Sequence, residues 1–372
     1  MKRSNYEIKN TLGMFDFLKG SIMLIVMLSH TAGLFDFLDA DFYMPKSFLQ
    51  AILIIGMIFV YVFGEASMPI MFILSGYGFR KTTFKKCLKR QFKTLIIPYL
   101  ISMVLVAVVN FCAFYIYYGN FQGTASETIR IFKNILLGYA EASPNWFLLA
   151  LVIGNLIFNH LASILDGKKL LLAATAVSCG GWALSLVGTV PFSLSQGLIS
   201  TLYICIGYFA KKKRIFLSEY STKKKVAMTV SIFAIALLLR CLGDDMNMSM
   251  NIYRLGPATI LGNALISLSF IWLFLYLNRF EGPVMDFIRR IGRYSLYVLC
   301  IHSIELKAVG DHIQDIFVKR WTGSIAMRNI IQFGVRAFVV LGATFIFVKL
   351  KHIYSFKKLA SKKAIILRRE QA

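Results

Sequence analysis

The sequence predicts an all-α polytopic membrane protein, a bundle of about ten transmembrane helices with the N and C termini in the cytoplasm. Three observations carry this prediction. Of the 372 residues, 57% are hydrophobic and the mean hydropathy is +0.65, which excludes an ordinary soluble globular protein. Several apolar runs reach the length of a membrane span. The net charge of +24 comes from Lys and Arg clusters between these runs, so it encodes orientation and nucleic acid is not an expected partner.

The first two predicted spans differ in character. Residues 15–35 form an apolar run that carries charged residues and is too long for a cleaved signal peptide, so we expect it to be retained. Residues 47–79 are long for one crossing and contain Gly56, Gly64, Glu65 and Pro69. This composition predicts one bent helix or a broken one.

The later spans follow the same apolar pattern. The third, residues 91–118, has Pro98 near its start, and the polar loop 119–144 has the pattern of a short amphipathic helix. The remaining seven are expected at 145–164, 168–187, 194–210, 225–242, 254–278, 292–309 and 325–350. The basic tail after Lys351 is expected on the membrane surface. We expect one membrane-embedded domain over residues 1–372, with no appended soluble domain.

Charge between the spans tests this count. The basic clusters follow the second, fourth, sixth, eighth and tenth spans: Arg80, Lys81, Lys85, Lys86, Lys89, Arg90 and Lys93; Lys168 and Lys169; Lys211, Lys212, Lys213, Arg214, Lys223, Lys224 and Lys225; Arg279, Arg289, Arg290 and Arg293; and Lys357, Lys358, Lys362, Lys363, Arg368 and Arg369. The loops that follow odd-numbered spans carry less positive charge, and the loop after the seventh span contains Asp244 and Asp245. The positive-inside tendency therefore places both termini, and the loop after every even-numbered span, in the cytoplasm.

The first span carries Asp16, Lys19 and His30 along one stripe. Lys19 and His30 are eleven residues apart, close to three helical turns, so they lie within roughly 20° of one another around the axis and about 16 Å apart along it. Ionisable groups at membrane depth usually line a bundle interior or a watery cavity. In the alternative interpretation, Asp16 and Lys19 extend to the interface and His30 caps the other end of the helix.

Cysteine and histidine spacing indicates neither disulfides nor a metal. Six cysteines occur singly, without a Cys-x-x-Cys pair, and the five histidines have no spacing typical of metal ligands. We therefore expect no bound metal and no permanently bound cofactor.

Five segments resemble, in order, the acyltransferase-3 family of integral membrane O-acyltransferases. They are FDFLKGSIMLIVMLSH at 15–30, MPIMFILSGYGF at 68–79, LKRQFKTLIIPYL at 88–100, NWFLLALV at 145–152 and IGRYSLYVLCIH at 291–302. Lys19 stands where the family more commonly has Arg, with ten residues between it and the family's His, here His30. The resemblance implies transfer of an acyl group, most often acetyl, from acyl-CoA at the cytoplasmic side. The acceptor would be a hydroxyl of a glycan or lipid-linked sugar at the outer side of a bacterial plasma membrane.

His30 is the predicted general base, because an imidazole titrates near neutral pH and can take a proton from a hydroxyl nucleophile. Asp16 and Lys19 complete the predicted catalytic set. Lys19 either forms a structural pair with Asp16 or contacts a cofactor phosphate.

Other residues of these segments have two interpretations each. The basic residues Arg80, Arg90 and Lys93 either set orientation alone or hold the phosphates of coenzyme A. Glu65, inside the second span, either lines the cavity of His30 or supports its wall.

Two residues near the outer side complete the predicted substrate site. Trp146 is either an interfacial anchor or part of an acceptor pocket. His302, followed by Glu305, is either a second cavity histidine or a structural residue between helices.

Two other functions fit the same residues. A transporter of a small solute such as an amino acid would use the same buried charges, although no inverted repeat is evident. A scaffold of a cell-envelope complex would gain nothing from charges at membrane depth.

Overall fold

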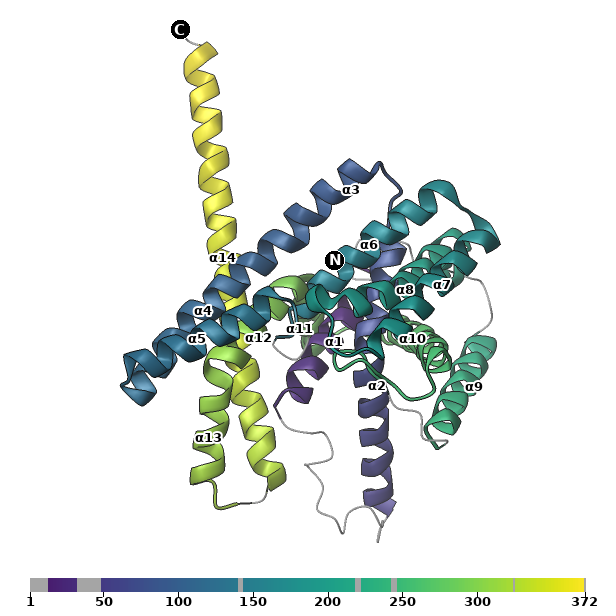
Figure 1. Ribbon diagram of the computed structural model, residues 1–372, viewed down its shortest axis with the longest axis horizontal. Coiled ribbons are helices and arrows are strands. Elements are labelled where there is room, and N and C mark those ends of the chain that lie inside the picture. The colour runs from purple at the N-terminus through teal and green to yellow at the C-terminus, as the bar shows by residue number, and fades with distance from the viewer. Residues whose placement is uncertain are drawn as a thin grey trace.

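The computed structural model is almost entirely helical (Figure 1). It describes residues 13–31, 48–139, 143–217, 222–241, 246–323 and 325–370. Its long helices cross one another in a bundle, and a short antiparallel pair of strands, β1 (Met246–Asn247) and β2 (Ile252–Tyr253), lies between the ninth and tenth helices.

The helices fall close to the predicted spans. They are α1 (Asp16–Ser29), α2 (Phe48–Gly78), α3 (Phe84–Gln91), α4 (Ile97–Tyr118), α5 (Phe121–Leu136), α6 (Trp146–Ile164), α7 (Gly167–Ser185), α8 (Leu194–Lys212), α9 (Thr222–Cys241), α10 (Pro257–Leu277), α11 (Pro283–Arg293), α12 (Ser295–Glu305), α13 (Asp311–Arg320) and α14 (Ile325–Glu370).

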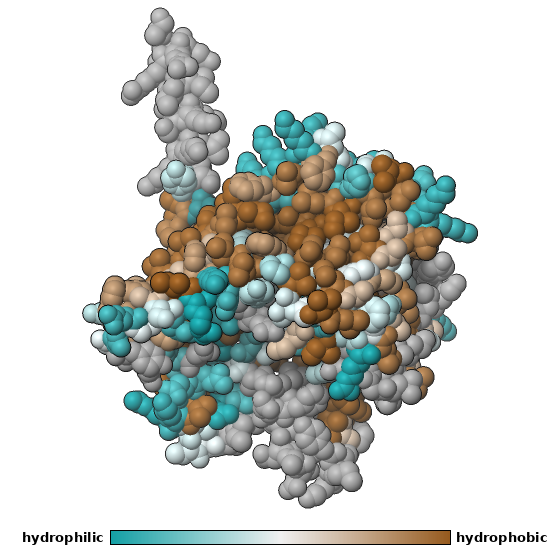
Figure 2. Space-filling view, in the orientation of Figure 1, coloured by the Kyte–Doolittle hydropathy of each residue, from teal (hydrophilic) through white to brown (hydrophobic). Residues whose placement is uncertain are grey.

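Among the described residues, six helical segments are long and apolar enough to cross a membrane. They are Ile54–Gly78, Phe84–Ile116, Trp146–Ile164, Pro191–Lys212, Pro257–Leu277 and Met327–Tyr354. Figure 2 shows a broad apolar surface bordered by hydrophilic residues, and α4 contributes the exposed side chains of Ile101, Val104 and Val108. The protein is therefore a multi-pass α-helical membrane protein. Helices α1, α7, α9 and α12, which overlap the predicted spans 15–35, 168–187, 225–242 and 292–309, are not among the six, so the count of ten stays a prediction.

The early spans show how local sequence sets helix boundaries. The second span is one continuous helix, α2, that runs through Pro69 rather than breaking there. The third starts earlier than expected, because α3 runs through a π-helical turn (Phe92–Ile96) into α4, with Pro98 in its first turn. The predicted amphipathic helix of the 119–144 loop is α5. Asn120 caps α5 by accepting hydrogen bonds from the main-chain N–H groups of residues 122 and 123.

The last two predicted spans depart further from expectation. The ninth, 292–309, is divided among the end of α11, α12 and a π-helical turn (Leu306–Gly310) that continues into α13. The tenth, expected to end at residue 350, continues as α14 to Glu370 and projects away from the other helices (Figure 1). The tail is rich in Lys, Leu, Ala and Arg, which favour helix.

Glycines allow the central helices to approach closely. A Cβ at Gly76 of α2 would overlap the main-chain oxygen of Ile204 in α8, and a Cβ at Gly207 of α8 would overlap that of Ile73 in α2. Small residues at helix crossings allow such backbone contact in a membrane, where packing rather than water exclusion drives association. This crossing fixes α2, which carries one wall of the cavity described below.

Several helix ends gather beside the start of α1. The ring of Phe15 lies 5.1 Å from that of Tyr77 near the end of α2 and 6.0 Å from that of Phe216 after α8. Asn278, after α10, donates a hydrogen bond of 3.2 Å to the main-chain oxygen of Met14. The exits of α2, α8 and α10 therefore lie at the end of the bundle where α1 begins, which is the arrangement that the charge pattern predicts. Which face of the membrane this end meets stays a prediction.

Candidate active site

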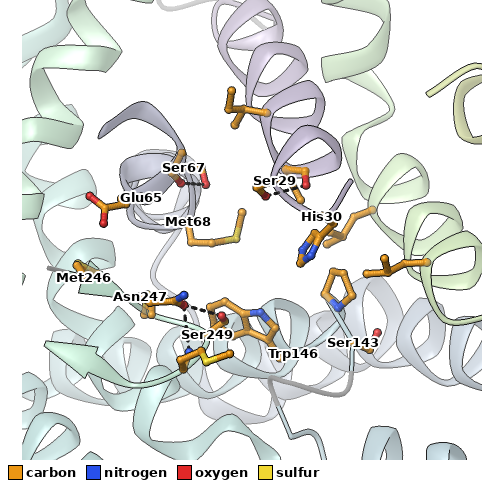
Figure 3. Close-up of a pocket in the computed structure, with 18 of the residues that line it drawn as sticks. Ser29, His30, Glu65, Ser67, Met68, Ser143, Trp146, Met246, Asn247 and Ser249 are labelled. Atoms are coloured by element: carbon orange, nitrogen blue, oxygen red, sulfur yellow. Dashed lines mark hydrogen bonds between the residues drawn. The ribbon is translucent and has the colours of Figure 1, made fainter. Parts of the chain in front are cut away.

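A cavity of about 630 Å³ lies among the end of α1, the middle of α2, the start of α6, the β1–β2 hairpin and the end of α12 (Figure 3). Its lining is mixed. Apolar side chains, several of them methionine, alternate with hydroxyl, amide and ionisable groups. Ligand sites in proteins combine an apolar surface with a few polar groups in this way.

His30 enters the cavity from the end of α1. It is the C-cap residue directly after Ser29, the last residue of the helix, and its N–H is bonded to the main-chain oxygen of Val26 at 3.3 Å. Its side chain is exposed, and its ring faces the central space across which Met68 of α2 lies (Figure 3). The main-chain oxygen of His30, which the helix leaves without a partner, accepts a hydrogen bond of 3.0 Å from Nη1 of Arg336 in α14.

A buried charged cluster stands behind His30. The ring of His302 lies 5.5 Å from the ring of His30, centroid to centroid. Nδ1 of His302 lies 3.3 Å from Oε2 of Glu305, and the Glu305 carboxylate accepts from Arg336 Nε at 2.7 Å and Nη2 at 3.2 Å. His302, Glu305 and Arg336 are each at most 4% exposed. Sequence reasoning left His302 as a cavity residue or a structural one; it contacts the ring of the cavity histidine without itself lining the cavity.

Trp146 and Glu65, both predicted substrate residues, line the same cavity as His30. Trp146 begins α6, where Asn145 is held by a 2.9 Å hydrogen bond from its Nδ2 to Ser102 Oγ. Its indole lies below the central space in Figure 3. The carboxylate of Glu65 points to the side of α2 toward Met246, away from the ring of His30 (Figure 3).

The hairpin forms the wall opposite α1. Asn247 and Ser249 lie beneath the cavity in Figure 3, joined by a 2.7 Å hydrogen bond from Ser249 Oγ to Asn247 Oδ1. The hairpin is attached to α8 through Gln196, whose Nε2 donates to the main-chain oxygen of Ser249 at 3.4 Å. It contributes Met246, Met248 and Met250, flexible side chains that adapt to the shape of a ligand.

Lys307 brings a positive charge to the lining. It lies in the π-helical turn after α12, and its main-chain oxygen accepts a 2.9 Å hydrogen bond from Nδ2 of Asn110 in α4. Asn110 is in turn fixed by Thr128 of α5, whose Oγ1 donates to Asn110 Oδ1 at 3.0 Å. Among the described residues that line the cavity, Lys307 alone is a lysine or arginine.

Asp16 and Lys19 lie outside this cavity. Lys19 Nζ is 2.8 Å from Asp16 Oδ1, and Arg293 Nε, at the end of α11, is 3.4 Å from Asp16 Oδ2. The Asp16 carboxylate is buried and pins the start of α1 to α11. The structure therefore realises the structural pair that the sequence left as one of two alternatives, while the catalytic role assigned to both residues is untested.

The predicted phosphate-binding residues lie around α3, also away from His30. Arg80 is exposed in the segment after α2, Arg90 is partly buried near the end of α3, and Lys93 is exposed in the π-helical turn that follows. Asn159 of α6 holds this segment by two hydrogen bonds to the main chain of Thr82, at 3.2 and 3.0 Å. The three cations thus flank a fixed segment at the end of the bundle where α1 begins.

Comparison of the sequence with known protein families shows which family this chain belongs to. The family model described as an acyltransferase domain, acyltransferase-3, matches residues 13–349, nearly the whole chain. The chain belongs to the acyltransferase-3 family. This acyltransferase is an enzyme that transfers groups other than aminoacyl groups, and its apolar helices make it a membrane acyltransferase. No curated protein and no solved structure is significantly similar to it.

The acyltransferase has two site cations that sequence reasoning missed. Arg336 and Lys307 both lie inside predicted spans, where an ionisable residue is by default a candidate functional group. That signal was present in the sequence for both. Neither was singled out, because neither falls in the segments that resemble the family.

Proposed function

We propose that this protein is a membrane O-acyltransferase in which His30 is the general base. The acyl donor is acyl-CoA, with acetyl as the first choice, reached from the cytoplasm. The acceptor is a hydroxyl of a cell-envelope or exported glycan, and the enzyme resides in the plasma membrane. The observation that carries the proposal is an exposed imidazole, fixed by its own main chain, at the edge of a cavity large enough for a sugar unit.

The reaction follows from the chemistry of that imidazole. A neutral ring nitrogen of His30 takes the proton of the acceptor hydroxyl as its oxygen attacks the thioester carbonyl. A carbon–oxygen bond forms, and the tetrahedral intermediate collapses with loss of the carbon–sulfur bond. The protonated His30 then returns its proton to the departing thiolate, so the products are an ester and free coenzyme A.

Other lining groups support the same step. Lys307 places a positive charge in the cavity, where the negative oxygen of the intermediate develops. Trp146 offers an aromatic surface, and Asn247 and Ser249 offer groups that bond sugar hydroxyls. Arg80, Arg90 and Lys93 remain the candidates for the phosphates of coenzyme A, and donor entry from their end of the bundle is part of the proposal.

His30→Ala tests the base directly. Membranes that contain the enzyme are given acetyl-CoA labelled in the acetyl group, and two quantities are measured: released coenzyme A, and label in the envelope glycan fraction. General bases contribute about 10²–10⁴-fold to rate, so we expect both quantities to fall by at least about a hundredfold. The matched control is His160→Ala, which removes an exposed histidine of α6 and is expected to leave both unchanged.

Full-rate glycan labelling by His30→Ala would end the assignment of the base. The transporter alternative has its own readout. Uptake of an amino acid by proteoliposomes of the purified protein, independent of acetyl-CoA and without coenzyme A release, would replace the enzymatic proposal with a carrier.

A further inference from the structure

Arg336 is the largest almost completely buried side chain of the described residues, and it takes no part in the reaction proposed for His30. It is 2% exposed, and it lies in the part of α14 that is apolar enough to span a membrane. A cation at membrane depth is costly to bury. Such a residue is retained for structure, for function or for both.

Its contacts reach the proposed base by two routes. Nη1 holds the main-chain oxygen of His30 at 3.0 Å. Nε and Nη2 hold both carboxylate oxygens of Glu305, and Glu305 in turn faces Nδ1 of His302 at 3.3 Å. The His302 ring lies against that of His30 at 5.5 Å. One planar guanidinium thereby fixes the backbone of His30 and, through two side chains, the ring packed against it.

The ring nitrogens of His302 supply an independent observation. Both are buried, and neither makes a well-formed hydrogen bond among the described residues, although Nδ1 lies 3.3 Å from Oε2 of Glu305. Because Nδ1 faces a carboxylate, the proton of a neutral His302 belongs on Nδ1 and the lone pair on Nε2. A buried acceptor without a donor needs an explanation, and the neighbouring ring of His30, whose centroid lies 5.5 Å away, becomes a donor when it is protonated.

We propose that Arg336 is a positioning residue for the proposed base, acting through Glu305 to orient His302, which accepts a hydrogen bond from protonated His30 during acyl transfer. The inference rests on the proposed function of His30. The charged and titratable groups around the histidine pair are Glu305, Arg336 and Lys307, with Glu65 farther along the cavity wall.

The test must separate positioning from folding, since loss of Arg336 alone leaves the Glu305 carboxylate buried and unpaired. The double variant Arg336→Met/Glu305→Met removes both charges, and an apolar replacement of a buried ion pair is often tolerated. Each variant is first checked for an unchanged elution volume and melting temperature in detergent. We then expect kcat of the double variant to fall about tenfold or more, with the KM for acetyl-CoA unchanged.

The rate–pH profile supplies a readout that a purely structural role would not move. In the double variant, loss of the Glu305 carboxylate and loss of the Arg336 cation act on protonated His30 in opposite directions. The remaining effect is loss of the oriented His302 acceptor, which leaves protonated His30 less stabilised, so we expect the acidic limb of the profile to move to lower pH. Arg336→Lys keeps a cation beside Glu305. A single ammonium group, however, cannot replace the planar guanidinium, whose N–H groups bond both the Glu305 carboxylate and the main-chain oxygen of His30. We expect it to show an intermediate kcat and an acidic limb near the wild-type position.

Two failures are distinguishable. If His30→Ala abolishes turnover while a folded double variant keeps the wild-type kcat and pH profile, the positioning role is overturned and the proposed function stands. If His30→Ala keeps full turnover, the proposed base fails, whatever the Arg336 variants show.

Discussion

At the scale of single residues, Lys307 shows how backbone geometry brings a charge into the lining of the cavity that His30 also lines. A π-helical turn adds a residue to the helical turn and changes the direction of the side chains that follow, and such turns are frequent at functional sites. Here the turn Leu306–Gly310 carries Lys307, and Asn110 satisfies its main-chain oxygen. The side chain therefore reaches the cavity from a fixed backbone.

Lys307→Met keeps an unbranched side chain only one atom shorter and removes its charge. If the ammonium stabilises the negative oxygen of the intermediate, kcat falls by about 10²–10³, the loss typical of removing one such group, while the KM for acetyl-CoA changes little. Steady-state kinetics of coenzyme A release measure both. Lys319→Met, on the exposed face of α13, is the matched control, and an unaltered kcat in Lys307→Met would remove Lys307 from the mechanism.

Sequence reasoning identified part of the cavity and missed the rest for a physical reason. Helical periodicity placed Lys19 and His30 on one stripe of the first helix. A shared face does not imply a shared cavity, because the two residues are about 16 Å apart along the helix axis and contact different neighbours. Glu65 and Trp146, from two other helices, do join His30. Hairpin residues such as Asn247 were out of reach, because a two-residue strand has no periodicity to detect.

At the scale of elements, the crossing of α2 and α8 depends on glycine. Gly207→Val places a branched side chain against the main-chain oxygen of Ile73, and overpacking of this kind costs about 1–3 kcal/mol or more. We expect a clearly lower melting temperature in detergent, measured by fluorescence-detected size-exclusion chromatography, together with reduced activity. Gly56→Ala in α2, where an added Cβ meets nothing within 4 Å, is the control; equal melting of the two variants would contradict this account of the crossing.

The elements also mark the limit of prediction from hydropathy. Hydropathy located α2, α4, α6, α8 and α10 closely, because each presents a long apolar run. It did not anticipate the division of the ninth span into α12 and the turn before α13, because buried Glu305 takes its charged partner, Arg336, from α14 rather than from the local sequence.

At the scale of the whole molecule, the charge pattern gives a testable orientation. In a variant without native cysteines, Gln122→Cys at the start of α5 and Glu281→Cys before α11 are both exposed positions on opposite predicted sides. A membrane-impermeant maleimide should label Gln122→Cys in intact cells and Glu281→Cys only after permeabilisation. The reverse pattern would invert the bundle and place His30 in the cytoplasmic half.

The buried pair of Arg336 and Glu305 has a consequence for how this protein is made. Glu305 leaves the ribosome about thirty residues before its cation, the 31-residue separation of that pair, so α12 enters the bilayer with an unneutralised carboxylate until α14 is translated. A nascent chain that stops before residue 336 never completes the pair. Acquisition of the final segment thus coincides with fixation of the His30 main chain, whose oxygen Arg336 holds at 3.0 Å.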